Sequence, residues 1–221
     1  MPHRQISYSG TSPWQDANTS GYSIEKMLFG DMDGDGKTDV FVSSGGRWMY
    51  SKMATSSWQQ IASSSVQLKN LALGDFNGDG KTDVFSATAN GWRYSSGGTS
   101  NWISLAPSTV SIENLRFGDF NGDGKTDVFS TTASGWRYSS GGTSNWIDLA
   151  PSSVPIENLR FGDFNGDGKT DVFSTTASGW RYSSGGTSNW IDLAPSTVPI
   201  ENLRFGDFNG DGKTDVLRIG F

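Results

Sequence analysis

The chain has 221 residues, no cysteine, one histidine and a formal net charge of −6. Without cysteine it forms no disulfide, thiolate metal site or cysteine nucleophile, and His3 alone makes a Ser-His-Asp triad or a multi-histidine zinc site untenable. The acidic balance argues against a nucleic-acid partner, and no apolar run approaches the roughly 18–20 residues of a membrane span. Residues 1–4 lead into polar sequence, so no signal peptide is expected in this chain.

An internal repeat of 44 residues accounts for almost the whole sequence. A nine-residue acidic segment begins at Asp31, Asp75, Asp119, Asp163 and Asp207. A tryptophan keeps the same interval at Trp14, Trp58, Trp102, Trp146 and Trp190. Five intervals of 44 make 220, one short of the chain length, and the copies at 113–156 and 157–200 differ only at Ser153 against Thr197. The chain is therefore five repeats and very little else.

Each repeat carries the pattern of four short strands. In the third repeat these are residues 115–120, 127–131, 136–139 and 146–149, rich in β-branched and aromatic residues and separated by Gly, Ser and Asn. No window shows sustained helical periodicity. Four strands in about 44 residues is the length of a β-propeller blade. The sequence predicts an all-β fold, a five-bladed β-propeller with four antiparallel strands per blade.

The two ends of the chain predict how the ring closes. The last copy stops after 215–219, which supplies strands one and two, whereas residues 6–14 match 92–102 with a two-residue deletion and supply strands three and four. The N-terminal strands are expected to complete the C-terminal blade and to pair its open edge. The alternative is an open fragment of a larger ring. The expected single domain, 1–221, has blades at about 27–62, 71–106, 115–150, 159–194, and 203–221 plus 4–17.

The acidic loop has the spacing of a cation site. In the third repeat, side-chain oxygens fall at loop positions 1, 3, 5 and 9, and Lys125 at position 7 offers its backbone carbonyl. Ca²⁺ takes six to eight oxygen ligands at flexible angles, whereas Mg²⁺ demands a tight octahedron. The loop begins like that of an EF-hand, but position 12 is Ser130 instead of Glu. The alternative is a set of Asx turns with solvated carboxylates.

The distribution of charge favours a bound cation. Sixteen of the 23 acidic residues lie in the five loops, and carboxylates so close together repel unless a cation offsets them. Five Ca²⁺ ions would move the net charge from −6 to +4. We therefore expect about five calcium ions, held by Asp31, Asp33, Asp35, Lys37, Asp39, Asp75, Asn77, Asp79, Lys81, Asp83, Asp119, Asn121, Asp123, Lys125, Asp127, Asp163, Asn165, Asp167, Lys169, Asp171, Asp207, Asn209, Asp211, Lys213 and Asp215.

These residues resemble a known family. Phe117-Gly118 before the loop and the pattern Asp-x-Asn-Gly-Asp-Gly-Lys-Thr-Asp within it are similar to the FG-GAP/VCBS repeats of integrin-type calcium propellers. The resemblance covers the whole chain and implies a cation between strands one and two of each blade. It also implies a secreted or cell-surface location, where calcium is millimolar. That family usually has seven blades, so five is a departure.

The acids outside the loops do not indicate an enzyme. A glycosidase needs two facing carboxylates in one cleft, which usually breaks repeat symmetry. Here they recur with the repeat, as Glu113, Glu157 and Glu201 and as Asp148 and Asp192. A non-catalytic module is expected.

Strand three suggests a repeated ligand site instead. Aromatic rings stack on sugar faces, and arginine donates to hydroxyls. The aromatic and arginine residues of strand three resemble the pockets between blades of fungal and horseshoe-crab propeller lectins. A monomeric, multivalent glycan- or glycoprotein-binding module is therefore expected. The alternatives are that these aromatics only pack blade against blade, and that the chain is a protein-binding or spacer module of a larger surface protein. The candidate residues are Trp48, Tyr50, Trp92, Arg93, Tyr94, Trp136, Arg137, Tyr138, Trp180, Arg181 and Tyr182.

Overall fold

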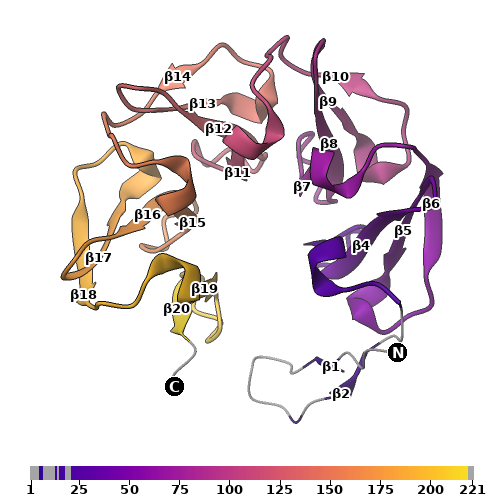
Figure 1. Cartoon of the computed structure of the whole chain (residues 1–221), viewed down its shortest axis with the longest axis horizontal. Helices are drawn as coiled ribbons and strands as arrows, with labels where there is room; N and C mark the ends of the chain where they lie inside the picture. The colour runs from indigo at the N-terminus through magenta and orange to yellow at the C-terminus, as the bar shows by residue number, and fades with distance from the viewer. Residues whose placement is uncertain (1–4, 7–12, 14, 18–20, 219–221) are drawn as a thin grey trace. The chain divides into compact units, whose positions relative to one another are not determined.

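The structure is a computed structural model that describes residues 5–6, 13, 15–17 and 21–218. Strands and short 3₁₀ turns make up its regular structure (Figure 1). The chain divides into two compact units, residues 1–113 and 114–221, and each is described by itself. The extent of a single domain over 1–221 stays a prediction. No helix among the described residues is long and apolar enough to cross a membrane.

The first unit contains one two-stranded and two four-stranded antiparallel sheets. In each four-stranded sheet, neighbouring strands are consecutive in the chain. The strands are β1 (Gln5–Ile6) with β2 (Gln15–Asp16), then β3 (Leu28–Gly30), β4 (Asp39–Ser44), β5 (Arg47–Ser51) and β6 (Gln59–Ser63), then β7 (Leu71–Gly74), β8 (Asp83–Thr88), β9 (Gly91–Ser95) and β10 (Ile103–Ser104).

The second unit repeats the same plan. Its two four-stranded sheets are followed by a two-stranded sheet, so the fifth repeat shows two of its four expected strands there. The N-terminal strands expected to complete it include residues 7–12 and 14, which lie outside the described residues. The strands are β11 (Arg116–Gly118), β12 (Asp127–Thr131), β13 (Trp136–Ser139) and β14 (Ile147–Asp148), then β15 (Arg160–Gly162), β16 (Asp171–Thr175), β17 (Gly179–Ser183) and β18 (Ile191–Pro195), then β19 (Leu203–Gly206) and β20 (Asp215–Arg218).

The second strand of each four-stranded sheet is its buried centre. In β12, the side chains from Asp127 to Ser130 are all buried, so both faces of the strand are covered. Phe129 is paired with Tyr138 on one side and with Arg116 on the other. The fourth strand, β14, is exposed. A central strand of β-branched and aromatic residues with a polar edge is what the sequence pattern predicts.

Short 3₁₀ turns stand at two places in each repeat, before strand one and after strand three. After strand three, Gly141 has φ 55° and Gly142 has φ 66°, which glycine adopts without strain. In the first repeat the same turn holds Met53 at φ 48° and Ala54 at φ 60°. The turns are η2 (Ile24–Lys26), η3 (Lys52–Ala54), η4 (Leu68–Asn70), η5 (Ser96–Gly98), η6 (Ile112–Asn114), η7 (Ser140–Gly142), η8 (Ile156–Asn158), η9 (Ser184–Gly186) and η10 (Ile200–Asn202).

The hydrophobic core of the second unit lies between its neighbouring sheets. Phe129 and Trp136 of one sheet share a buried cluster with Leu159 and Val172 of the next repeat. Phe129 and Val172 are fully buried. Successive repeats therefore stabilise one another by burying apolar side chains across their common boundary.

Candidate functional site

The first aspartate of each acidic loop closes the loop on itself. Asp119 Oδ1 accepts the backbone N–H groups of Gly122 at 2.7 Å and Asp123 at 3.2 Å, and Oδ2 accepts that of Gly124 at 2.8 Å. The two glycines have φ 78° and 80°. The same three bonds form at Asp31, Asp75, Asp163 and Asp207. The backbone conformation of each loop is therefore fixed by hydrogen bonds to the carboxylate of its first aspartate.

The last aspartate of the loop is buried at the start of strand two. Asp127 is 0 % exposed, and its two carboxylate oxygens accept the backbone N–H groups of Phe120 at 2.9 Å and Gly141 at 2.8 Å. It thereby ties the loop to the turn after strand three. Asp39, Asp83 and Asp171 are buried and bonded in the same way.

The buried aspartates are electrostatically unfavourable in their charged form. Burial raises the pKa of Asp127 to about 6, against the opposing effect of its two backbone donors, and the nearby Asp123 and Asp119 raise it further. The pKa of Asp83 rises to about 6 for the same reasons, and that of Asp171 is also raised. A cation beside such a carboxylate would offset both its desolvation and its carboxylate neighbours.

Positions 3 and 5 of the loop carry the remaining side-chain oxygens. Asn121 Oδ1 accepts the N–H of Asp123 at 2.8 Å, and Asn121 Nδ2 donates to Asp123 Oδ2 at 3.0 Å and to Ser140 Oγ at 2.9 Å. The backbone N–H of Lys125 donates to Asp123 Oδ1 at 2.9 Å. This bond holds the backbone of Lys125, at position 7, beside the side chain of Asp123.

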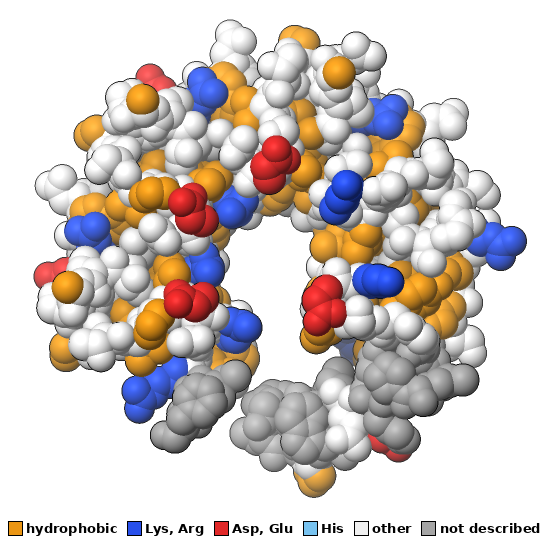
Figure 2. Space-filling view, viewed as in Figure 1, with side chains coloured by type: hydrophobic (Ala, Val, Ile, Leu, Met, Phe, Trp, Pro, Cys, Tyr) orange, Lys and Arg blue, Asp and Glu red, His pale blue; other side chains and the backbone are white. Residues whose placement is uncertain are grey.

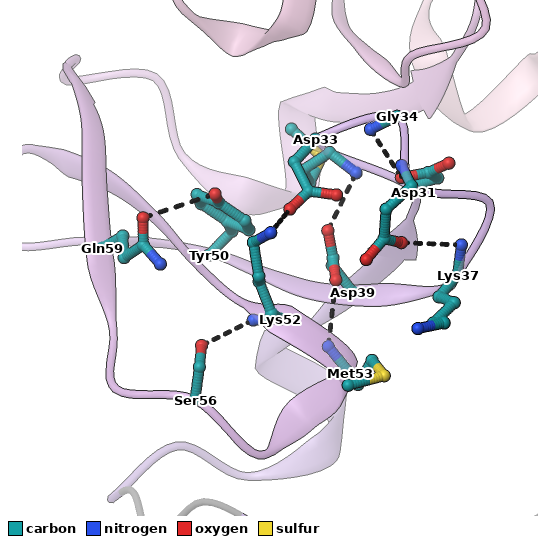
Figure 3. Close-up of polar contacts among 12 residues, drawn as sticks. Asp31, Asp33, Gly34, Lys37, Asp39, Tyr50, Lys52, Met53, Ser56 and Gln59 are labelled. Atoms are coloured by element: carbon teal, nitrogen blue, oxygen red, sulfur yellow. Dashed lines mark hydrogen bonds and ion pairs between the residues drawn. The ribbon is translucent and has the colours of Figure 1, made fainter.

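The residues of the loop fit a hard divalent cation. In the first loop, Asp31, Asp33 and Asp39 each offer one carboxylate oxygen, and these oxygens lie within 4.8 Å of one another (Figure 3). All the side-chain donors predicted for the loops are oxygens of Asp or Asn, the ligand type that Ca²⁺ prefers. Each carboxylate oxygen has more than one lone pair, so a backbone bond does not prevent coordination.

Successive loops touch one another through three residues. In the second unit, Thr170 of the fourth loop donates its N–H to the carbonyl oxygen of Asp119 in the third loop at 2.6 Å. A Cβ on Gly118 would lie 2.6 Å from Thr170 Cγ2, so this residue must be glycine. The stem of Lys169 lies over Gly122, where a Cβ would be 3.3 Å from Lys169 Cε. Thr82 with Asp31 and Thr214 with Asp163 repeat the contact.

The aromatic residues of strand three lie mostly inside the protein. Trp48, Trp92 and Trp136 are each 2 % exposed, and Tyr50 and Tyr182 are also buried. Trp136 meets Trp190 of the following repeat edge to face, with ring centroids 5.3 Å apart. Trp48, which meets Trp102, and Trp136 therefore pack against the following repeat, the alternative weighed from the sequence. The burial argues against their direct contact with a sugar.

The arginines of strand three have a packing partner that the sequence did not indicate. The guanidinium carbon of Arg181 lies 4.1 Å from the ring centroid of Trp190, and Arg93 and Arg137 lie 4.2 Å from Trp102 and Trp146. Such cation–π contacts hold the planar guanidinium at a fixed place. The tryptophans recur every 44 residues, so the repeat itself could have pointed to this pairing.

Equivalent cavities recur between the turn before strand one and the end of strand two. In the first unit a cavity of about 520 Å³ is lined by Ser65, Val66, Asn70, Ser86 and Ala87, with Arg93 and Lys69 at its margin. In the second unit a cavity of about 470 Å³ is lined by the residues 88 positions later, Ser153, Val154, Asn158, Ser174 and Thr175, and by residues 199–201. Hydroxyl, amide and apolar groups line both, together with Lys69 and Arg93 in the first and Glu201 in the second.

On the face drawn in Figure 2, the charged side chains of the described residues do not gather into one basic surface. Acidic and basic side chains of each unit lie there in small, separate groups. A nucleic-acid binder usually presents a continuous basic stripe.

Comparison with known proteins identifies the repeat. A family model described as an FG-GAP-like repeat matches residues 31–86, 75–130, 119–174 and 163–217. No curated protein matches the chain.

Two solved structures share the fold at 14 % sequence identity. One, reported as the specific recognition of non-reducing terminal N-acetylglucosamine by an Agrocybe aegerita lectin, has a TM-score of 0.62 and is matched over 86 % of this chain and 59 % of that one. The other is the Photorhabdus luminescens Tc holotoxin pore, with a TM-score of 0.63 and coverage of 97 % and 12 %. The chain thus spans 59 % and 12 % of these two proteins, and at this identity the likeness concerns the fold alone.

Proposed function

Because the chain belongs to the FG-GAP-like repeat family, we propose that it is a calcium-stabilised, non-catalytic binding module with several equivalent carbohydrate sites. The observation that carries this proposal is the recurrence of one cavity at the same place in the repeat, in both units. Several weak equivalent sites give strong attachment to a multivalent surface. The fold likeness to a lectin is consistent with such a role.

The proposed calcium role is structural. The first and last aspartates of each loop would hold the ion, with the residues at positions 3, 5 and 7 completing its oxygen shell. Bound calcium supplies positive charge that offsets the loop carboxylates, including the buried Asp83 and Asp127 whose pKa is raised. A secreted or cell-surface location, where calcium is millimolar, belongs to the same proposal.

The proposed ring has five blades, with the N-terminal strands completing the blade of β19 and β20. Support comes from the five 44-residue repeats and from the two strands, β19 and β20, of the fifth repeat. Deleting residues 1–17 tests the closure. We expect the deletion variant to self-associate through the open edge of β20 and to melt lower, by analytical ultracentrifugation and calorimetry. A monomeric variant with an unchanged melt contradicts the closed ring.

The lining of the cavities suits a neutral sugar. Ser and Asn side chains donate to and accept from hydroxyl groups, and Val66 and Val154 offer an apolar surface to a ring face. The stacked Arg93 lies at the margin of the first cavity, where its guanidinium can donate. The buried strand-three tryptophans act behind the cavities as packing.

A glycan array probed with labelled protein in calcium tests the carbohydrate role. The hits are then titrated by calorimetry with Asn70→Ala and Asn158→Ala, whose side chains are exposed at the two cavities. Each variant is expected to lose about one binding equivalent without a change in melting temperature. Asn189→Ala, also exposed and outside both cavities, is the matched control. Unchanged binding in both cavity variants contradicts these sites.

A protein-binding or spacer role is the second candidate, and one observation favours it. Ile103, Ile147 and Ile191 lie at the same place on the fourth strands β10, β14 and β18, and each is 42 % exposed. These strands are edges of their sheets, where an extended segment of another protein can add. An array without hits, together with retention of a protein ligand that Ile147→Asp abolishes, would favour this role.

A further inference from the structure

In the first repeat, two residues that face each other differ from their counterparts in the repeats that follow. Position 3 is Asp33 in the first loop and asparagine in the rest. Nineteen residues later, in the turn after strand three, the first repeat has Lys52 where the next three have serine. The residues that take these two places in the second, third and fourth repeats are Asn77 with Ser96, Asn121 with Ser140, and Asn165 with Ser184.

In each of these four repeats the two residues bond to each other, but the kind of bond differs in the first repeat. Asn121 Nδ2 donates to Ser140 Oγ at 2.9 Å, and the two other asparagine–serine pairs bond alike. In the first repeat, Lys52 Nζ instead forms an ion pair with Asp33 Oδ2 (Figure 3). The Asp33 side chain is 16 % exposed and that of Lys52 is 42 % exposed. The neutral hydrogen bond of the other repeats has become a partly buried ion pair.

The ammonium of Lys52 reaches the carboxylates expected to hold the metal. Asp33 is one of three aspartates, with Asp31 and Asp39, whose oxygens lie within 4.8 Å of one another. The pKa of Asp33 is lowered, first of all by Lys52, so its carboxylate stays charged for that contact.

The exchange leaves the charge of the site unchanged. Four loop carboxylates with the Lys52 ammonium sum to −3, and the three loop carboxylates of each other repeat also sum to −3. The extra negative charge of Asp33 is therefore matched by a cation that belongs to the chain. A divalent ion that binds Asp33 competes with this ammonium for the same carboxylate and brings a second positive charge beside it.

We propose that the Lys52 ammonium is the resident cation of the first loop, so that calcium fills the other loops first and this loop last and weakly. The inference rests on the proposed calcium role of the loops. It predicts that the Asp33 carboxylate keeps its ammonium partner when calcium is withdrawn.

Calcium titration of the full chain tests the order of filling. Calorimetry of the calcium-free protein is expected to give one fewer tight site than Lys52→Ser, in which the first loop gains at least tenfold in affinity. The matched transplant, Asn121→Asp with Ser140→Lys, is expected to lose one tight site while its circular dichroism stays that of the parent. Equal site counts in the parent, in Lys52→Ser and in the transplant contradict the proposal.

A melt in chelator separates this inference from the calcium proposal. Lys52→Met keeps the apolar stem but removes the ammonium, so it should lower the melting temperature in chelator and regain most of the loss in calcium. Ser140→Met, the equivalent change in the third repeat, removes no charge and should not show that recovery. If the chain takes up no calcium at all, the calcium proposal fails. An unchanged melt of Lys52→Met in chelator overturns the resident ammonium in either case.

Discussion

The backbone N–H of Thr170 donates to the carbonyl oxygen of Asp119 at 2.6 Å, and the N–H of Asp119 donates back to Thr170 Oγ1 at 2.9 Å. This reciprocal pair joins the acidic loops of two neighbouring repeats. The position of the first aspartate in one loop therefore depends on the threonine of the next loop. The close approach is possible because Gly118, just before Asp119, has no side chain.

Gly118→Ala should therefore destabilise the chain by about 2 kcal/mol, because the new methyl group would overlap Thr170 and force it to move. The free energy of unfolding in urea measures the effect. Gly206→Ala is the matched control, since the nearest atom to its Cβ is Phe208 Cζ at 3.4 Å, an ordinary contact. Equal losses in the two variants would mean that the joint between loops is not what restricts Gly118.

Calcium should raise the melting temperature strongly. At about ten times a dissociation constant of roughly 10⁻⁴ M, each tight site contributes about 1.4 kcal/mol, or about 6 kcal/mol for the four loops other than the first. For a chain of this size each kcal/mol moves the melt by roughly 2–4 °C, so chelator should lower it by well over ten degrees. Calorimetry with calcium and with chelator checks this, and a melt indifferent to both contradicts the metal assignment.

Without calcium, stability should fall as the pH rises from about 4 to about 6. The pKa of Asp83 and Asp127 is about 6 in the folded chain, above the ordinary value of about 3.9, so the folded state binds more protons across that window. Asp33 and Asp167 have lowered pKa values and act in the opposite direction, below that window.

Urea unfolding of calcium-free protein at pH 4.5 and pH 6.5 measures this slope. Calcium should remove it, because the bound cation favours the charged carboxylates at both pH values. Stability that rises with pH in the calcium-free protein would contradict the reading of these two aspartates.

The turn after β5 should be improved by glycine. Ala54 has φ 60°, where a side chain costs about 1 kcal/mol, and the following repeats have glycine at this place. Ala54→Gly is expected to raise the free energy of unfolding by about 1 kcal/mol. Ala87→Gly, inside β8, should lower it by about 0.5–1 kcal/mol and serves as the comparison. If Ala54→Gly instead lowers the free energy of unfolding by a similar amount, the packing of the Ala54 methyl group outweighs the backbone strain.

Repetition made much of the fold predictable. The loop between strands one and two follows from the spacing of Asp119 and Asp127, and the four strands follow from the alternation of Gly-rich turns with aromatic runs. The family assignment from Phe117-Gly118 and the loop pattern is confirmed by the four matched repeats. These features are local, so a single repeat contains all the information they need.

The ligand-facing residues were harder to predict, because burial depends on the neighbouring repeat. Trp136 could equally have faced a cavity from its sequence alone; it is buried because Trp190 and Leu159 of the next repeat cover it. Lys52 passed unnoticed because it lies outside the acidic loop. A column-by-column comparison of the repeats, which sets Lys52 against Ser96, would have revealed it.

The contact between Thr170 and Asp119 also bears on how such a chain can grow. Every 44-residue copy in this stretch carries both halves of the joint, the aspartate at the start of its loop and the threonine at position 8. A copy inserted by gene duplication therefore meets its neighbours with surfaces that already fit, and no second change is needed. The near-identity of residues 113–156 and 157–200 is what lengthening by such self-complementary units leaves behind.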